Sequence, residues 1–190
     1  MTTSAQQAFE SLLVDLAAQT PAPGGGCASA WAGALAAALG EMVASFAGDP
    51  HAADKATALR AELLAAGERE LFSYAPVLEA ARLSKSDPLR EQRLDAALSE
   101  ASETPLSIAR ASTGVAELAA AIAAQSTSAV AGDAMAAALL AEASSRAAAR
   151  LVEINLATHA DDPRLAEVSE LTLRATAARD AVLAGRSRQG

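Results

Sequence analysis

Aromatic residues and cysteine are both scarce in this chain. Phe, Trp and Tyr together make up 3% of its 190 residues, and there is a single cysteine. One cysteine excludes an internal disulfide and is typical of proteins from a reducing compartment. The first ten residues lack the basic and apolar segments of a secretory signal peptide. We therefore expect a cytoplasmic protein whose fold needs no disulfide.

Strand-forming sequences and metal-binding motifs are missing as well. Runs of Val, Ile, Thr and Tyr are absent, which argues against a sheet. The chain has no HExxH sequence, no cysteine pair and no histidine cluster, so we expect no bound metal. His51 and His159 are both expected at helix ends, in contact with solvent. The net charge of −8 argues against binding to nucleic acid or to anionic membrane surfaces.

What the chain does contain is alanine. Hydrophobic residues make up 52% of it, and alanine supplies much of that fraction. Alanine is the best helix former, and a core built from it requires closely packed backbones. The length suggests one domain that can bury a sizeable core. We predict an all-α fold, a compact bundle of five to six long helices over residues 1–190, with a disordered tail over 186–190.

Apolar periodicity and the positions of Pro and Gly set the helix boundaries. Helices are predicted over 4–18, 26–47, 52–83, 88–124, 133–156 and 163–184. In the first of these, one apolar face carries Phe9, Leu12, Leu13 and Leu16. Pro76 is expected to kink the third helix near residues 72–76. At Pro105, one continuous helix and two segments bent at this proline both fit the pattern.

The helix over 26–47 is apolar all round, which favours a central place in the bundle. Residues 26–48 carry one charge, Glu41, and are long enough to span a bilayer. However, they are mostly Ala, Gly and Ser, and a buried glutamate would be costly in lipid. The flanks also lack the Lys and Arg residues that anchor spans. We interpret this segment as a bundle helix and expect no membrane association.

Immediately before this helix lies a proline- and glycine-rich loop, Thr20-Pro-Ala-Pro-Gly-Gly-Gly26. A loop that leads directly into a helix leaves free N–H groups at the positive end of the helix dipole. Such a place can receive a carboxylate, a phosphate or a carbonyl oxygen. The same pattern also fits a tight corner between two packed helices. It is not a P-loop, because no Lys-Ser/Thr follows, and not a dinucleotide fingerprint, because no strand precedes it.

Five side chains outside the loop's glycines are candidates for chemistry or binding. Cys27 is either a small buried thiol or a thiol activated by the helix N-terminus. Asp133 falls in the first turn of its predicted helix, where it is either a cap or a reactive acid. Glu70 lies in the middle of the third helix, on or beside its apolar stripe. Lys85 and Arg93 flank the turn into the fourth helix and are exposed cations by default.

The loop and the helix after it, through Leu-Gly-Glu-Met-Val43, resemble the opening of the cyclodeaminase/cyclohydrolase family. The resemblance extends from about Phe9 to Leu173. Its further segments are Ala80–Lys85 with Arg93, Ala101–Leu106, Gly132-Asp133-Ala134, Ala138–Ala143 and Ile154-Asn155-Leu156.

The resemblance implies a homodimeric helical bundle that acts on a tetrahydrofolate derivative without a further cofactor. Family members open or close the one-carbon bridge between N5 and N10 of tetrahydrofolate. The reaction is either cyclising deamination of 5-formiminotetrahydrofolate or hydrolysis of 5,10-methenyltetrahydrofolate to 10-formyltetrahydrofolate. Both reactions need a proton acceptor and a proton donor, and the resemblance implies Asp133 in this role, with Glu70 next. The implied substrate-binding residues are Pro23, Gly24, Gly25, Gly26, Cys27, Lys85, Arg93 and Asn155.

Besides Cys27, where the family usually has serine, and Ser84, where it usually has proline, three positions depart from the family pattern. Many members have aspartate where this chain has Glu70, serine where it has Gly132, and asparagine where it has Leu151. These departures favour an alternative: a catalytically degenerate member that serves as a folate-binding or protein-interaction bundle.

Overall fold

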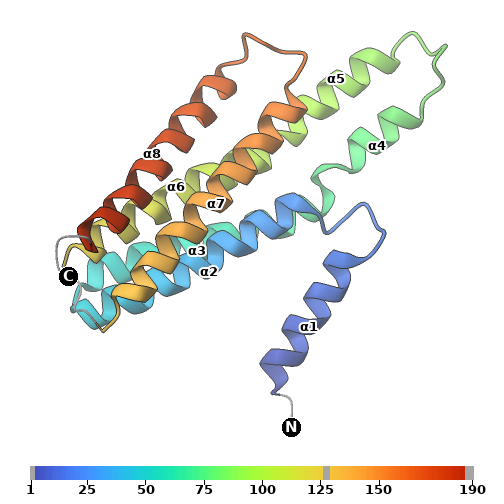
Figure 1. Cartoon of the computed structure of the whole chain (residues 1–190). Coiled ribbons are helices and arrows are strands. Elements are labelled where there is room, and N and C mark those ends of the chain that lie inside the picture. Colours follow the sequence, from blue (N-terminus) through green and yellow to red (C-terminus); the bar gives the residue numbers. More distant parts are fainter. Residues whose placement is uncertain (1–2, 126–128, 187–190) are drawn as a thin grey trace.

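The computed structural model describes residues 3–125 and 129–186, and it is all α-helical over these ranges (Figure 1). Its helices are α1 (Ser4–Ala17), α2 (Gly25–Ala47), α3 (Pro50–Ser73), α4 (Ala75–Arg82), α5 (Arg90–Ala101), α6 (Glu103–Ala123), α7 (Ala131–Asn155) and α8 (Pro163–Arg186). Helices α2, α3, α6, α7 and α8 form an elongated bundle, and α4 and α5 extend from one end as a hairpin. The predicted all-α bundle is thus confirmed. Of the tail predicted over 186–190, only Arg186, which ends α8, lies within the described residues.

Two of the six predicted helices are each divided near an internal proline. Tyr74 separates α3 from α4, and Ser102 separates α5 from α6. Pro76 and Pro105 both lie in the first turn of the helix that follows the break. A proline has no N–H to donate, and the first turn of a helix requires no such donor. Each break therefore precedes its proline by two or three residues, and the two-segment alternative at Pro105 is confirmed.

Helix α2 lies at the centre and packs against α3, α6 and α7. Gly33 allows a close approach of α6, because a Cβ atom there would lie 2.7 Å from Oγ of Ser112. Ser144 Oγ donates to the carbonyl oxygen of Ser29 at 2.6 Å, so Ser112 is the donor in its 2.7 Å bond to Ser144. These buried hydroxyls are all paired, and they bind the three helices at one level of the core.

The C-terminal end of α2 is a glycine-terminated turn. Gly48 adopts a left-handed conformation with φ of 70°, and its N–H group donates to the carbonyl oxygens of Ala44 and Ser45. Asp49 then caps α3 by accepting from the N–H group of Ala52 at 3.0 Å. By length and composition, residues 25–47 and 90–123 are two helical stretches apolar enough to cross a membrane. Buried core helices pass the same test, so this finding is weak evidence for spans.

Helix α1 stands apart from the bundle (Figure 1), and none of its residues is buried. The apolar face predicted from the sequence is present, but Phe9 and Leu13 are 51% and 47% exposed. Within one copy of the chain, the apolar face of α1 is therefore largely uncovered, although the sequence predicts that it faces the core.

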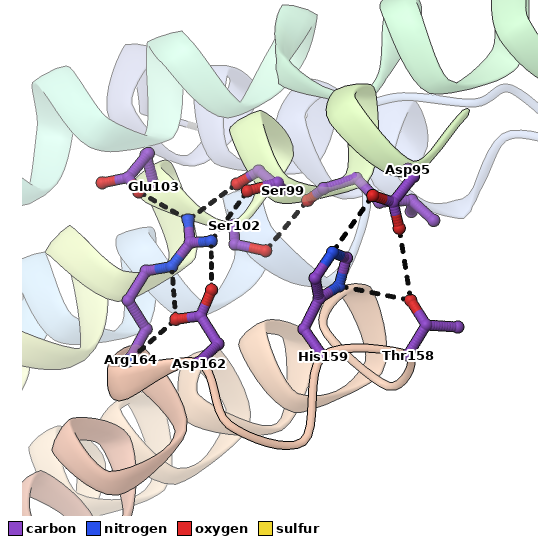
Figure 2. Close-up of polar contacts among 9 residues, drawn as sticks. Asp95, Ser99, Ser102, Glu103, Thr158, His159, Asp162 and Arg164 are labelled. Carbon is purple, nitrogen blue, oxygen red and sulfur yellow. Dashed lines mark hydrogen bonds and ion pairs between the residues drawn. The ribbon is translucent and has the colours of Figure 1, made fainter. Parts of the chain in front are cut away.

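Residues of the α7–α8 connection and of the first turn of α8 form hydrogen bonds with α5 and with the start of α6 (Figure 2). Arg164 donates to the Ser99 carbonyl at 2.8 Å, to Glu103 at 2.6 Å and to Asp162 at 2.7 Å. The hydrogen bonds from Arg164 lower the pKa of Asp162 to about 2. His159, expected in solvent, is half-buried and its Nε2 lies 3.1 Å from Oδ2 of Asp95. These hydrogen bonds hold α5, and with it the α4–α5 hairpin, against the start of α8.

Candidate active site

The glycine-rich loop leads into α2 as predicted. Gly24 is the N-cap residue, and because it has no side chain, no side-chain acceptor caps the first turn. Gly25 is exposed whereas Gly26 is buried, and the peptide bond between Ala22 and Pro23 is cis. The N–H groups of this first turn lie at the positive end of a helix of 23 residues. The loop thus has the donors that an oxygen ligand requires.

The side chain of Glu70, from α3, packs directly on Gly26. A Cβ atom added at Gly26 would lie 2.0 Å from Oε1 of Glu70 and 2.4 Å from its Cδ. No comparable restriction applies to Gly25, around which the space is open. Of the three consecutive glycines, Gly26 is therefore the one whose missing side chain makes room for a carboxyl group.

Burial and one hydrogen bond determine the chemistry of this carboxyl group. Burial raises the pKa of Glu70, while the hydroxyl of Ser73, which donates to Oε2 at 2.9 Å, acts in the opposite direction. Glu70 therefore holds its proton to a higher pH than an ordinary glutamate does. A carboxyl group of this kind can donate or accept a proton nearer neutral pH.

Two hollows are lined by residues that neighbour Glu70 in the sequence, Leu71 in one and Arg69 and Ser73 in the other. The first, of about 360 Å³, lies between the end of α1, the loop and the start of α2, and its lining includes Pro23 and Trp31. The second, of about 490 Å³, lies under the α4–α5 hairpin and includes Ser73 and Arg69. The second hollow includes the hydroxyl of Ser73, which is the hydrogen-bond partner of Glu70.

Asp133 does not join this group within one copy of the chain. Near the start of α2, Ser29 accepts from Ser144, whereas at its far end Ala44 shares a core cluster with Ala134. Helices α2 and α7 are therefore antiparallel, and Asp133 lies about 25 Å along α2 from Gly26. Asp133, which the resemblance implies as the acid or base of the site, therefore lies away from the glycine-rich loop within one protomer, because α7 begins at the opposite end of the bundle.

Two other predicted ligand-binding residues, Cys27 and Asn155, take up separate positions. Cys27 is fully buried and its thiol donates to the Gly67 carbonyl at 3.6 Å, so it packs α2 on α3 rather than facing a ligand. Burial raises the pKa of this thiol, and the nearby Glu70 carboxylate adds to the effect, so it is not activated by the helix N-terminus. Asn155 is also buried and donates to the Ala101 carbonyl at 3.2 Å.

The two predicted cations lie on the hairpin. Arg93 lines a groove of about 460 Å³ between α4 and α5, and Lys85 is exposed in the loop at the hairpin's tip. Glu79 and Glu100 line the same groove as Arg93, which reduces the attraction of a polyanion to it.

Sequence reasoning missed two residues of this site, Trp31 and Ser73. Trp31 lies over Gly67, where an added Cβ atom would be 2.9 Å from the indole nitrogen. Its position one turn into α2, four residues after Cys27, was an available signal. Ser73 follows Glu70 by three residues, a spacing that places both side chains on one face of a helix. Among the described residues, no group of three His, Cys, Asp or Glu side chains is placed to hold a metal ion.

The profile of the formiminotransferase-cyclodeaminase family matches residues 8–172. The chain belongs to this family. Among solved structures, the crystal structure of formiminotetrahydrofolate cyclodeaminase from Thermotoga maritima is similar to it. The two chains are 24% identical, the match covers 92% of each, and the TM-score is 0.82, which shows a shared fold. Among curated proteins, no significant sequence match was found. The glycine-rich loop and Glu70 both lie within the residues that the family profile matches.

Proposed function

We propose that this protein acts on a tetrahydrofolate derivative at the glycine-rich loop, where it forms or opens the bridge between N5 and N10. The observation that carries the proposal is the Glu70 carboxyl group, half-buried against Gly26 beside the uncapped first turn of α2. Family membership supports the class of substrate. The Thermotoga maritima protein of the same fold is named a formiminotetrahydrofolate cyclodeaminase, which favours the cyclising deamination over the hydrolysis.

The deamination requires one proton to be removed and one to be delivered. N10 of the folate attacks the formimino carbon held on N5, a tetrahedral intermediate forms, and ammonia leaves to give 5,10-methenyltetrahydrofolate. When the formimino group starts out protonated, N10 loses its one proton and the departing nitrogen gains one. In our proposal Glu70 accepts the first proton as a carboxylate and supplies it to the leaving nitrogen. The raised pKa of Glu70 suits the second step, because the acid form persists closer to neutral pH.

The hydrolysis uses the same groups in the opposite sense. Water adds to the methenyl carbon and loses a proton to the carboxylate. The bond from that carbon to N5 then breaks as N5 takes up this proton, and the added hydroxyl releases its remaining proton to solvent and becomes the carbonyl of 10-formyltetrahydrofolate. The N–H groups of the first turn of α2 would hold a substrate oxygen in either reaction. Trp31 and Pro23 would form the apolar wall against the pteridine ring.

A direct assay separates the two reactions and tests both. Purified protein is mixed with 5-formiminotetrahydrofolate and release of ammonia is measured; with 5,10-methenyltetrahydrofolate, loss of its absorbance is compared with spontaneous hydrolysis. Because Trp31 is the single tryptophan, its fluorescence reports binding in the same samples. Acceleration of either reaction supports the proposal. Quenching of Trp31 by folate without turnover would favour the alternative of a folate-binding bundle that has lost the chemistry.

Three further expectations belong to this proposal. A cytoplasmic location accords with the single buried cysteine. A homodimer accords with the exposed apolar residues of α1 and α2. Association with nucleic acid is not expected, because the net charge is −8.

A further inference from the structure

The two oxygens of the Glu70 carboxyl group have different surroundings. Oε1 lies toward Gly26, in the space that a Cβ atom on that residue would need. Oε2 accepts a hydrogen bond of 2.9 Å from the hydroxyl of Ser73, which is half-buried and is the last residue of α3. One oxygen of the acid therefore lies at the glycine-rich loop, while the other is held by a residue of its own helix.

The hydroxyl of Ser73 has a second acceptor within reach. The main-chain carbonyl oxygen of Glu70 lies 3.3 Å from the same Oγ atom. In a continuous helix this carbonyl would accept from the N–H group four residues later, which is that of Tyr74. The N–H group of Tyr74 donates to the Phe72 carbonyl instead, because α3 ends here, ahead of Pro76. The break between α3 and α4 thus makes the Glu70 carbonyl available to the serine hydroxyl.

A serine hydroxyl can donate one hydrogen bond and accept another at the same time. When Glu70 is ionised, Ser73 donates to Oε2. When Oε2 carries a proton, that O–H group can donate to Oγ of Ser73, and the serine proton can turn to the Glu70 carbonyl oxygen. The exchange requires the rotation of one hydroxyl, because both acceptors already lie within hydrogen-bonding distance.

We infer that Ser73 is a positioning residue that holds the Glu70 carboxyl group in one place in both of its protonation states, by exchanging one hydrogen bond for another. This inference rests on the proposed function, in which Glu70 accepts a proton and then delivers it. A carboxyl group that does both in one turnover must stay at the reacting atoms after it has been protonated. A single hydroxyl with two acceptors meets this requirement.

The two bonds of Ser73 differ in strength. The bond to the carboxylate is the shorter one and is charge-assisted, so Ser73 stabilises the ionised form more than the acid form. Burial raises the pKa of Glu70 and the bond from Ser73 lowers it. From α2, the Cys27 thiol faces Glu70, and because burial raises the pKa of this thiol, it is neutral where Glu70 titrates. The charged side chains that line the two hollows beside this helix are Asp15, Arg69, Glu100 and Glu103.

The pKa of Glu70 tests the inference without a substrate. Carbon-13 NMR titration of labelled glutamate carboxyl groups compares the wild type with Ser73→Ala and Ser73→Thr, and Glu70→Gln assigns the signal. We expect the pKa of Glu70 to rise in Ser73→Ala, because the bond that favours the ionised form is lost. In Ser73→Thr, which keeps the hydroxyl, we expect the wild-type value. An unchanged pKa in Ser73→Ala would overturn the inference.

Denaturant unfolding at two pH values tests whether the acid form is held as well. Ser45→Ala is the matched control, because the hydroxyl of Ser45 donates to a main-chain carbonyl, that of Glu41, near the end of α2. Relative to this control, we expect Ser73→Ala to lose stability at pH 4, where Glu70 is protonated, and to lose more at pH 8. A loss confined to pH 8 would mean that Ser73 holds the carboxylate alone, and would overturn the inference.

Kinetics on 5-formiminotetrahydrofolate separate this inference from the proposed function. For Ser73→Ala we expect kcat to fall on the order of 10-fold with little change in KM, and the acid limb of the pH profile of kcat to move to higher pH. Ser73→Thr should behave as the wild type. An active wild type whose Ser73→Ala variant has the same kcat and pH profile would overturn the inference. An inactive wild type, with the expected changes in pKa and stability in Ser73→Ala, would support the pairing of Ser73 with Glu70 and reject the proposed function.

Discussion

The contact between Gly26 and Glu70 makes a quantitative prediction for Gly26→Ala. The new methyl group would lie 2.0 Å from Oε1 of Glu70, whereas ordinary contacts of a Cβ atom begin at 3.4 Å. The flexible carboxyl end must therefore move by more than 1 Å, while the backbone stays in place. A misplacement of about 1 Å in a catalytic group costs on the order of 100-fold in rate.

The same substitution should change stability very little. Displacement of the carboxyl group breaks its bond with Ser73, which costs about 1 kcal/mol. Replacing glycine by alanine inside a helix contributes about 0.5–1 kcal/mol in the opposite direction. We thus expect a free energy of unfolding within about 1 kcal/mol of the wild type.

Denaturant unfolding and initial rates of ammonia release, measured on the same preparations, check both numbers. Gly40→Ala is the matched control, because its Cβ atom would meet nothing closer than 4.0 Å and it lies on the buried side of the same helix. The control should keep its activity and gain about 0.5–1 kcal/mol. A Gly26→Ala enzyme that is folded and works at the wild-type rate would refute a catalytic role for Glu70. Partial recovery in Gly26→Ala/Glu70→Asp, whose shorter side chain leaves room for the methyl group, would support it.

Three further outcomes can be measured independently of the substrate. The pKa of Glu70 in the folded protein is raised above its ordinary value of 4.5, so the stabilising contribution of its protonated form is complete below that pH and is lost as the pH rises through the folded pKa. Glu70→Gln should therefore be more stable relative to wild type at pH 7 than at pH 4. Equal differences in the free energy of unfolding between variant and wild type at the two pH values would contradict the burial argument. Arg164→Gln removes the side-chain hydrogen bonds that contribute most to lowering the pKa of Asp162 to about 2, and it keeps the bond from the backbone N–H of residue 164, so an NMR titration should find that pKa raised toward its ordinary value of 3.8. A pKa that remains near 2 would mean that the guanidinium of Arg164 is not what lowers it. Leu63 is fully buried in the core, so Leu63→Ala should reduce the free energy of unfolding by about 2–5 kcal/mol in denaturant melts. A much smaller loss would mean that the surrounding side chains fill the cavity left by the substitution.

Much of the fold could be predicted from the sequence because its determinants are local. The glycine-rich loop, the left-handed Gly48 and the two internal prolines fix where helices begin and end over a few residues. The proline rule also accounts for the shift of the break from Thr104 to Ser102, since Pro105 occupies the first turn of α6.

The composition of the site depends on long-range packing that periodicity does not encode. The spacing placed Glu70 near the apolar face of its helix, but its contact with Gly26 joins residues from two different helices. Asp133 was expected at the glycine-rich loop because the sequence does not state that α2 and α7 run in opposite directions. The exposed apolar face of α1 has the same origin, because its partner is not determined by the pattern of α1 itself.

The most direct test of the account compares wild type and Glu70→Gln on 5-formiminotetrahydrofolate, with Trp31 fluorescence recorded for both. We predict release of ammonia by the wild type, a loss on the order of 100-fold in kcat for the variant, and similar quenching of Trp31 in the two proteins. Equal kcat values for the two proteins, or no release of ammonia by a wild type whose Trp31 is quenched, would contradict catalysis by Glu70 at the glycine-rich loop.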